Sequence, residues 1–120
     1  MAKDDYHVIV YQILSYLYGQ LKKGHPVDPN CLRNNGKLYT IPEAYWQYII
    51  VNLLNAGYIC GVTATSKINI NDERVIIIQN SEATQITPTG IEYLTENSFL
   101  RKAARFAGDV MSIVPFELIP

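Results

Sequence analysis

Four side chains on one amphipathic segment could make hydrogen bonds and apolar contacts with DNA base edges. Gln47, Tyr48, Val51 and Asn55 share the outer face of a helix predicted over residues 40–56. A Gln or Asn amide can bind adenine through two hydrogen bonds, and tyrosine and valine can touch the methyl group of thymine. The alternative is that Gln47 and Asn55 are simply solvated polar residues of a helix.

Contacts with DNA phosphates would have to come from outside this helix. Residues 38–66 contain no lysine or arginine, and the chain has a formal net charge of −1. The candidate phosphate contacts are Arg33, Lys37, Lys67 and Arg74, which flank the helix on both sides. Phosphate contacts supply much of the affinity of DNA-binding proteins. The charge pattern therefore keeps open a second function, a protein-interaction module that does not bind DNA.

The histidines and cysteines of this chain do not have the spacing of a known catalytic or metal-binding motif. His7 falls in the first predicted helix and His25 in a proline-bounded loop, without a local motif of a hydrolase or nucleotide-binding enzyme. Cys31 and Cys60 lack the spacing of zinc ligands and are expected to be free, buried thiols. We therefore predict that the protein is not an enzyme and needs no cofactor or metal.

The helix with the four candidate base contacts has sequence signals at both ends. Thr40 and Glu43 have the spacing of a capping box, and Pro42 suits a first turn. Gly57 can adopt the left-handed conformation that ends a helix. The residues that follow, 58–65, have the β-branched and apolar composition of a strand.

Two kinds of element are predicted before this helix. A core helix is expected over residues 4–23, with Tyr16 outside its apolar stripe. The stripe has the 3.6-residue period and consists of Tyr6, Ile9, Val10, Ile13, Leu14, Leu17 and Leu21. A short helical turn capped by Asp28 and a brief strand over residues 37–39 should follow.

A β-hairpin and two more helices are predicted after it. Strands over residues 58–65 and 74–79 flank the turn signal Asn71-Asp72, and a short strand over 84–86 should pair back onto them. Thr87 should cap a helix that starts at Pro88. The last helix, about 98–114, has a wide apolar side on which a homodimer could form. The candidate dimer residues are Phe99, Phe106, Val110 and Val114, and the alternative is that this helix packs wholly on its own domain.

A capped helix that leads directly into a β-hairpin is the central element of a winged helix. The fold class predicted here is α+β, winged helix (winged helix-turn-helix-like), with an extended β wing and an added C-terminal helix. A length of 120 residues suits one domain, with a core over about residues 4–97. Because the chain has neither a signal-peptide pattern nor a long apolar run, we expect a cytoplasmic protein with no membrane partner.

Two blocks of sequence resemble a known family. EAYWQYIIVNLLNAGYICGV, ITPTGIEYLTENSFLRKA and the amphipathic start are similar to the YjcQ-like family of small, often phage-associated bacterial winged-helix proteins. The resemblance covers about residues 5–114, and the chain departs from it at 65–81, which is longer. It implies a winged-helix fold and a regulatory role, and it assigns no ligand or catalytic residue.

The sequence thus favours a non-catalytic winged-helix protein that binds duplex DNA and takes part in transcription regulation, with a phage-related role implied by the resemblance. The alternative is a winged-helix module with an unidentified protein partner. The nine tyrosines of the chain fit this alternative, because protein interfaces often bury such amphipathic rings.

Overall fold

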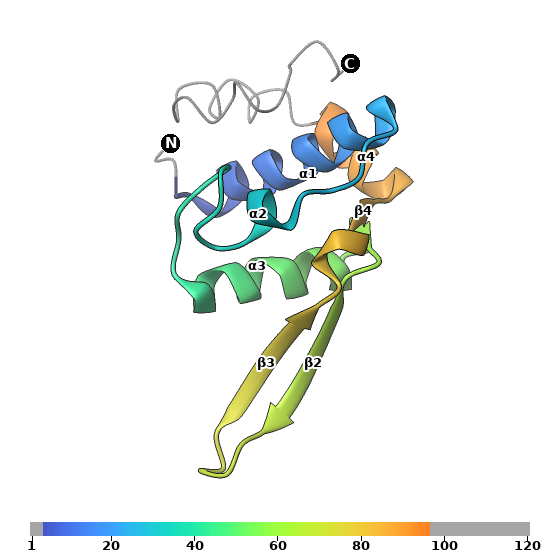
Figure 1. The fold of residues 1–120 in the computed structure, drawn as a ribbon. Coiled ribbons are helices and arrows are strands. Elements are labelled where there is room, and N and C mark those ends of the chain that lie inside the picture. The colour runs from blue at the N-terminus through green and yellow to red at the C-terminus, as the bar shows by residue number, and fades with distance from the viewer. Residues whose placement is uncertain (1–3, 97–120) are drawn as a thin grey trace.

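The computed structural model describes residues 4–96, which fold into four α-helices, a 3₁₀ helix and two small antiparallel sheets (Figure 1). The α+β prediction is confirmed. Helix α1 (Tyr6–Lys23) packs against α3 (Glu43–Asn55), α4 (Pro88–Glu96) and the short strand β4 (Gln85–Ile86). The β2–β3 hairpin extends away from these helices (Figure 1). The predicted helix over 98–114 lies outside the described residues.

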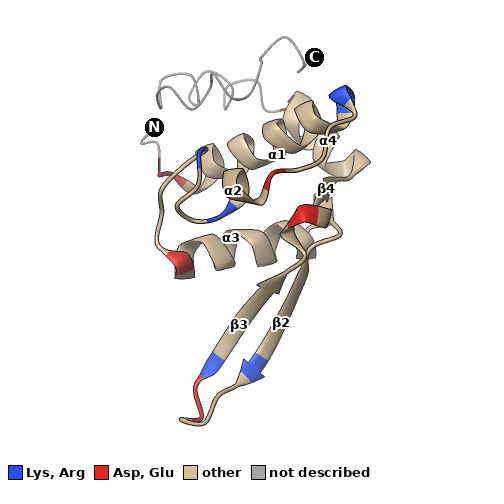
Figure 2. Ribbon diagram, in the orientation of Figure 1, with Lys and Arg blue, Asp and Glu red and all other residues tan. Residues whose placement is uncertain are grey.

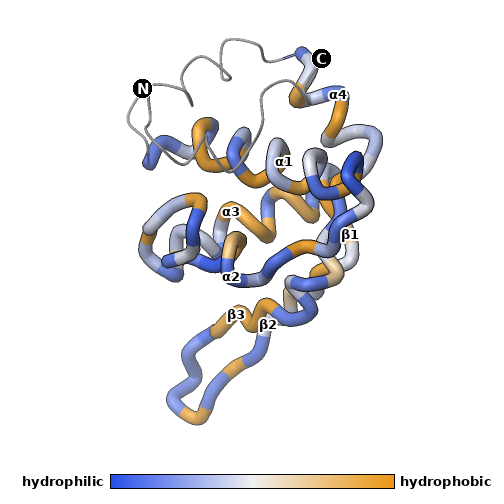
Figure 3. Tube along the Cα trace, turned by 45° about the horizontal axis from the view of Figure 1, so that its top comes forward, coloured by the Kyte–Doolittle hydropathy of each residue, from blue (hydrophilic) through white to orange (hydrophobic). Residues whose placement is uncertain are grey.

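Most charged residues of the described part of the chain lie at helix ends, in loops and on the hairpin (Figure 2). None of those in residues 4–96 is buried, whereas the buried polar residues there are the uncharged Gln12, Ser15 and Thr84. Figure 3 shows hydrophobic segments recurring along α1 and α3, while the hairpin alternates between hydrophilic and hydrophobic residues. The hydrophobic core therefore lies between the helices.

Helix α1 is buried on nearly all sides. Every residue from Val8 to Leu17 is buried, including Tyr16, whose predicted place outside the apolar stripe was wrong. Its hydroxyl accepts a hydrogen bond from the backbone N–H of Asp28 at 2.9 Å, so this polar atom can be buried at little cost. Leu21, predicted within the stripe, is instead 50% exposed.

The segment after α1 confirms one prediction and contradicts another. The short helix α2 (Pro29–Leu32) is capped as expected, since the Asp28 carboxylate accepts a hydrogen bond from the Asn30 N–H at 2.9 Å. Residues 37–39 form no strand. Lys37 donates its N–H to the Asn30 carbonyl at 3.2 Å, so the backbone here folds back on α2 and has no neighbouring strand to pair with.

Helix α3 begins later than its capping-box spacing indicated. It starts at Glu43, and Pro42 occupies the N-cap position without a side-chain cap bond. A proline disfavours helical geometry in the residue before it, so Ile41 cannot join the helix and Thr40 lies too far back to cap it. The predicted C-terminus is confirmed. Gly57 has φ +77°, and Gly57 and Tyr58 donate their N–H groups to carbonyls of the last helical turn at 3.0 Å each, as in a Schellman motif.

The predicted strand over 58–65 is divided in two. Strand β1 (Ile59–Cys60) pairs with β4, while β2 (Thr63–Ile68) pairs with β3 (Arg74–Gln79). Gly61 separates β1 from β2 with φ +91°. A Cβ atom here would collide with the Ala83 carbonyl of the 3₁₀ helix η1 (Ser81–Ala83), so the chain must bend at a glycine. The boundaries of β3 and the pairing of β4 back onto the first strand match the prediction.

Thr87 connects the start of α4 to the end of α3. Its hydroxyl accepts a hydrogen bond from the Gly90 N–H at 3.1 Å and donates one to the Gly57 carbonyl. Its own N–H donates to the Tyr58 carbonyl at 3.0 Å. The predicted cap of α4 is therefore confirmed, and it also fixes two helices relative to each other.

Candidate functional site

The four side chains predicted to contact DNA bases lie on one side of α3, within an arc of about 100° whose two edges are Gln47 and Tyr48. Successive residues of an α-helix are rotated by about 100°. Gln47 accordingly faces the hairpin, where its amide donates a hydrogen bond to the Ile76 carbonyl at 3.0 Å. Tyr48 faces α1 and is 60% exposed. Val51 is half-buried and Asn55 is exposed.

The Gln47 bond attaches the hairpin to α3. Ile76 lies opposite Ser66 in the register of the hairpin, and its carbonyl accepts from Gln47 across the outer edge of β3. An adenine contact by the same amide would require this bond to break. In the described fold, Gln47 therefore positions the hairpin.

The two candidate phosphate contacts before α3 lie near α2. Arg33 is the residue that ends α2, and it is exposed. Lys37 has its ammonium nitrogen 4.0 Å from a carboxylate oxygen of Asp28, with both side chains partly exposed. Such a surface ion pair contributes little stability, but it places a negative charge beside one of the expected cations.

The two candidates after α3 project from opposite faces of the hairpin. Lys67 lies opposite Val75, and Ile68 lies opposite Arg74. Because successive strand residues alternate between faces, Lys67 and Arg74 point to different sides. Figure 2 shows basic residues toward the far end of the hairpin, next to an acidic turn and well separated from the basic residues around α2. The four predicted cations thus do not gather at α3.

The structure instead brings together aromatic side chains that the sequence did not group. We call this the tyrosine patch, which consists of Tyr6, His7, Tyr45, Tyr48, Tyr58 and Tyr93. The rings of Tyr6 and Tyr48 meet edge to face at 6.1 Å, and those of Tyr58 and Tyr93 lie 5.0 Å apart. His7 Nδ1 lies 3.3 Å from the Tyr93 hydroxyl. The number of tyrosines was the only signal for this cluster, because its members come from α1, α3, the segment before β1, and α4.

The patch is continuous, because Tyr6 contacts both His7 and Tyr48 and His7 lies beside Tyr93. Partial burial raises the pKa of Tyr6, and the neighbouring hydroxyls of Tyr48 and Tyr58 raise it further. Burial is also the main cause of the raised pKa of Tyr45, followed by the carboxylates of Asp4 and Asp5. Tyr45 donates a hydrogen bond to the Asp4 carbonyl at 2.7 Å. The patch therefore has an acidic end at the start of α1.

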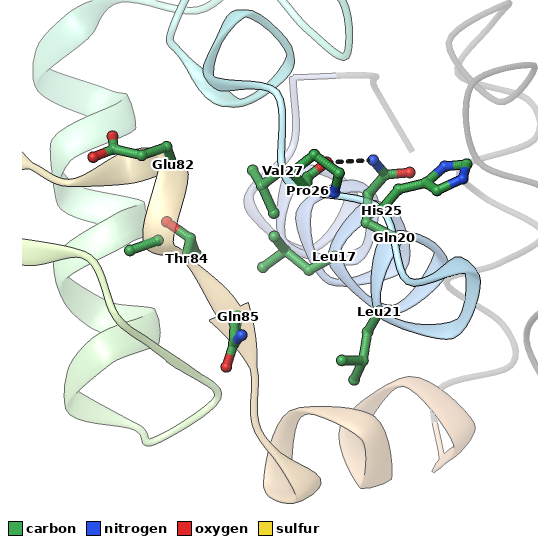
Figure 4. Close-up of a pocket in the computed structure, with 10 residues that line it drawn as sticks. Leu17, Gln20, Leu21, His25, Pro26, Val27, Glu82, Thr84 and Gln85 are labelled. Atoms are coloured by element: carbon green, nitrogen blue, oxygen red, sulfur yellow. Dashed lines mark hydrogen bonds between the residues drawn. The ribbon is translucent and has the colours of Figure 1, made fainter.

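A small pocket of about 120 Å³ lies between the C-terminal half of α1 and the segment that leads into β4. Figure 4 shows Leu17 and Val27 facing Thr84 across it, with the imidazole of His25 projecting away. The Gln20 amide is bonded to the Pro26 carbonyl at 2.7 Å. Polar and apolar residues line the pocket in equal number, and its two titratable side chains, His25 and Glu82, lie at opposite ends of the view in Figure 4.

Both cysteines are free, as predicted, but only Cys31 is buried. Cys60 is exposed because it points to the opposite face of β1 from the buried Ile59, which corrects the expectation of two buried thiols. Within residues 4–96, no three His, Cys, Asp or Glu side chains gather closely enough to hold a metal ion. No helix of this region has the length and apolar character needed to cross a bilayer.

The chain was compared with curated proteins, with solved structures and with models of protein families. No curated protein and no solved structure matches the chain. The model of the family described as YjcQ protein matches residues 11–112, which is most of this chain. The chain therefore belongs to the YjcQ family.

Proposed function

We propose that this chain is a non-catalytic winged-helix module that binds another protein. The order of elements supports the winged-helix part of this proposal. Helix α3 has the place of a recognition helix, and the β2–β3 hairpin that follows through β1 has the place of the wing. The direct passage from α3 through Gly57 into β1 is the connection expected in such a fold.

The observation that favours a protein partner is the apolar exposure of the hairpin. Ile68 is 67% exposed, Ile70 is 98% exposed and Val75 is 37% exposed. Ile68 and Val75 lie on opposite faces of the hairpin and Ile70 lies at its turn, so a partner that encloses the end of the hairpin would bury all three side chains. The candidate phosphate contacts are dispersed and have acidic neighbours, so the same region offers phosphates little concentrated positive charge.

DNA binding is the second candidate, and one observation favours it. Lys67 and Arg74 project from the two faces of one hairpin. A two-stranded ribbon that enters a DNA groove could use such a pair to contact both phosphate backbones. Tyr48, Val51 and Asn55 would then be the available base contacts on α3, and a role in transcription regulation would follow.

Fluorescence anisotropy with labelled duplex DNA at low salt separates the two candidates. For a protein-binding module we expect no salt-dependent binding at micromolar protein. A DNA-binding protein should lose affinity with added salt, with a log–log slope of about −0.9 per phosphate contacted. Its affinity should also fall in the variants Lys67→Ala and Arg74→Ala. That combination would overturn the protein-binding proposal.

Affinity capture with matched variants tests the protein partner directly. We would immobilise the wild-type chain, an Ile68→Ser/Ile70→Ser variant, and Leu21→Ser as the control. Leu21 is also an exposed apolar residue, but it lies on α1. The proposal expects a protein that the wild type and the Leu21 variant retain and the hairpin variant loses. Equal capture by all three, or no captured protein, would contradict it.

A further inference from the structure

We propose that the tyrosine patch binds an arginine-bearing segment of a partner protein. This inference deepens the proposed function, since it needs a protein partner, but it concerns a surface separate from the hairpin. The patch lies on α1, α3, α4 and the segment before β1, and the apolar hairpin residues belong to β2, β3 and their turn. The two surfaces can therefore succeed or fail in separate experiments.

The geometry of the patch leaves aromatic surface open to a ligand. Tyr48 is 60% exposed, and its ring meets Tyr6 at an interplanar angle of 69°. An edge-to-face pair of this kind leaves part of a ring face uncovered. Tyr58 and Tyr93 continue the surface with rings tilted by 37°. A flat cationic group could stack on such rings.

Charge complementarity selects a cationic ligand. Asp4 and Asp5 lie beside Tyr45 at one end of the patch, and on α4 Glu96 is one helical turn beyond Tyr93. The lysines and arginines in residues 4–96 belong to other segments, namely the end of α1, the region of α2, and the hairpin. Those of α1 lie at its opposite end, about 25 Å away at 1.5 Å per residue. Carboxylates beside aromatic rings would attract a cation and repel phosphate groups.

Another tyrosine of this chain already has a cation at its ring. The ammonium nitrogen of Lys22 lies 4.8 Å from the centroid of the Tyr18 ring, within the range of a cation–π interaction. Arginine suits the patch better than lysine. Its planar guanidinium can stack on a ring and form two parallel hydrogen bonds with a carboxylate. Both partners are present here, since Tyr45 lies next to Asp4 and Asp5.

Peptide binding to the full-length chain tests this inference. The probes are two fluorescein-labelled peptides of equal length and charge, one alternating Arg with Gly and the other alternating Lys with Gly. We expect the arginine peptide to bind more tightly. Tyr48→Ala should raise its dissociation constant by about threefold to thirtyfold, the range that cation–π energies imply. Asp4→Asn/Asp5→Asn should also weaken binding, and the Asp5 side chain makes no helix-cap bond whose loss would unfold α1.

Tyr18→Ala is the matched control, because it removes a tyrosine of α1 that lies outside the patch. It should leave peptide affinity unchanged. The inference is overturned if both peptides bind equally, if Tyr48→Ala and Tyr18→Ala behave alike, or if no binding occurs at millimolar peptide. Tyr48→Ala that weakens duplex DNA binding instead would assign the patch to nucleic acid. If the arginine peptide fails while hairpin-dependent capture persists, the proposed function stands and only this inference falls.

Discussion

The helical body of the molecule and its β2–β3 hairpin are stabilised in different ways. In the body, which consists of α1, α3, α4 and the β1–β4 pair, Ile9, Ile13 and Ile49 are completely buried. In the hairpin, no residue from Thr63 to Gln79 is fully buried, and those toward the turn are the most exposed. Isolated two-stranded hairpins are marginally stable in water. The hairpin therefore depends on its attachment to the body, where Gln47 bonds to Ile76 and Ile78 packs against the core.

This difference suggests a division of roles. The body has close packing that specifies one arrangement of helices. The hairpin has spare hydrogen-bonding edges and exposed isoleucines, which suit contact with another molecule. The comparison can be tested by variants that affect one region and spare the other.

The largest effect is expected from a cavity in the body. Leu53 is 1% exposed, and Leu53→Ala should lower the free energy of unfolding by about 2–5 kcal/mol. Ile70→Ala removes a side chain that is 98% exposed at the hairpin turn and should change stability by less than about 0.5 kcal/mol. Urea unfolding followed by Trp46 fluorescence measures both. Similar losses in the two variants would contradict the division between body and hairpin.

The junction between the two regions should be nearly as sensitive. Gly61→Ala forces a residue with φ +91° to accept a Cβ atom that collides with the Ala83 carbonyl. Gly57→Ala is the control, since Gly57 has φ +77° but open space where the Cβ would lie. Backbone strain alone should cost Gly57→Ala about 1–2 kcal/mol, and we expect a larger loss for Gly61→Ala. Thermal unfolding monitored by circular dichroism compares them, and equal losses would show that the chain accommodates the collision.

A smaller and local effect is expected where the hairpin meets α3. Gln47→Ala removes the bond to Ile76 and should cost about 1 kcal/mol. Amide hydrogen exchange should become faster in β2 and β3 and stay unchanged in α1. Asn52→Ala is the matched control, because the Asn52 amide bonds within its own helix, to the Tyr48 carbonyl at 2.7 Å. If Gln47→Ala accelerates exchange uniformly, the bond does not serve to hold the hairpin.

The last effect is absent at neutral pH and appears only at alkaline pH, and it arises in the body because the hairpin strands contain no tyrosine. Burial raises the pKa of Tyr16 from its ordinary 10.0 to about 12. Between these values the unfolded chain loses the proton while the folded chain keeps it. The contribution of Tyr16 to stability is therefore complete below pH 10 and is lost as pH rises toward 12.

Tyr16→Phe removes this titration, together with the hydrogen bond from the Asp28 N–H. The free energy of unfolding should therefore decline less steeply above pH 10 in the variant than in the wild type. Urea titrations at pH 8, 10 and 11 measure the two slopes. Parallel slopes would mean that other groups cause the alkaline loss.

Predictions from sequence succeeded where the signal is local. Asp28 caps α2, Thr87 caps α4, and Gly57 ends α3, because each of these interactions involves residues within a few positions of each other. The boundaries of β3 also follow from its own run of β-branched residues. The capping box at Thr40 failed for an equally local reason, since Pro42 prevents the preceding residue from becoming helical.

Predictions failed where distant segments meet. The strand expected over 37–39 has no partner, and the bend at Gly61 is required by the carbonyl of Ala83. Tyr16 is buried because the backbone of Asp28 supplies a hydrogen bond to its hydroxyl. None of these contacts can be recognised from the period or composition of the segment concerned.

The sequence by itself determined the helices, the hairpin and the polar residues on the outer face of α3. Only the tertiary structure decided what those residues contact, so that Gln47 bonds to the hairpin and Tyr48 joins the tyrosine patch. The physical reason is one of range. Capping and periodicity act over a single helical turn, whereas the neighbours of an exposed side chain are set by how all the helices pack together. The patch unites residues from Tyr6 to Tyr93, and only the packing of α1 against α3 and α4 brings them to one surface.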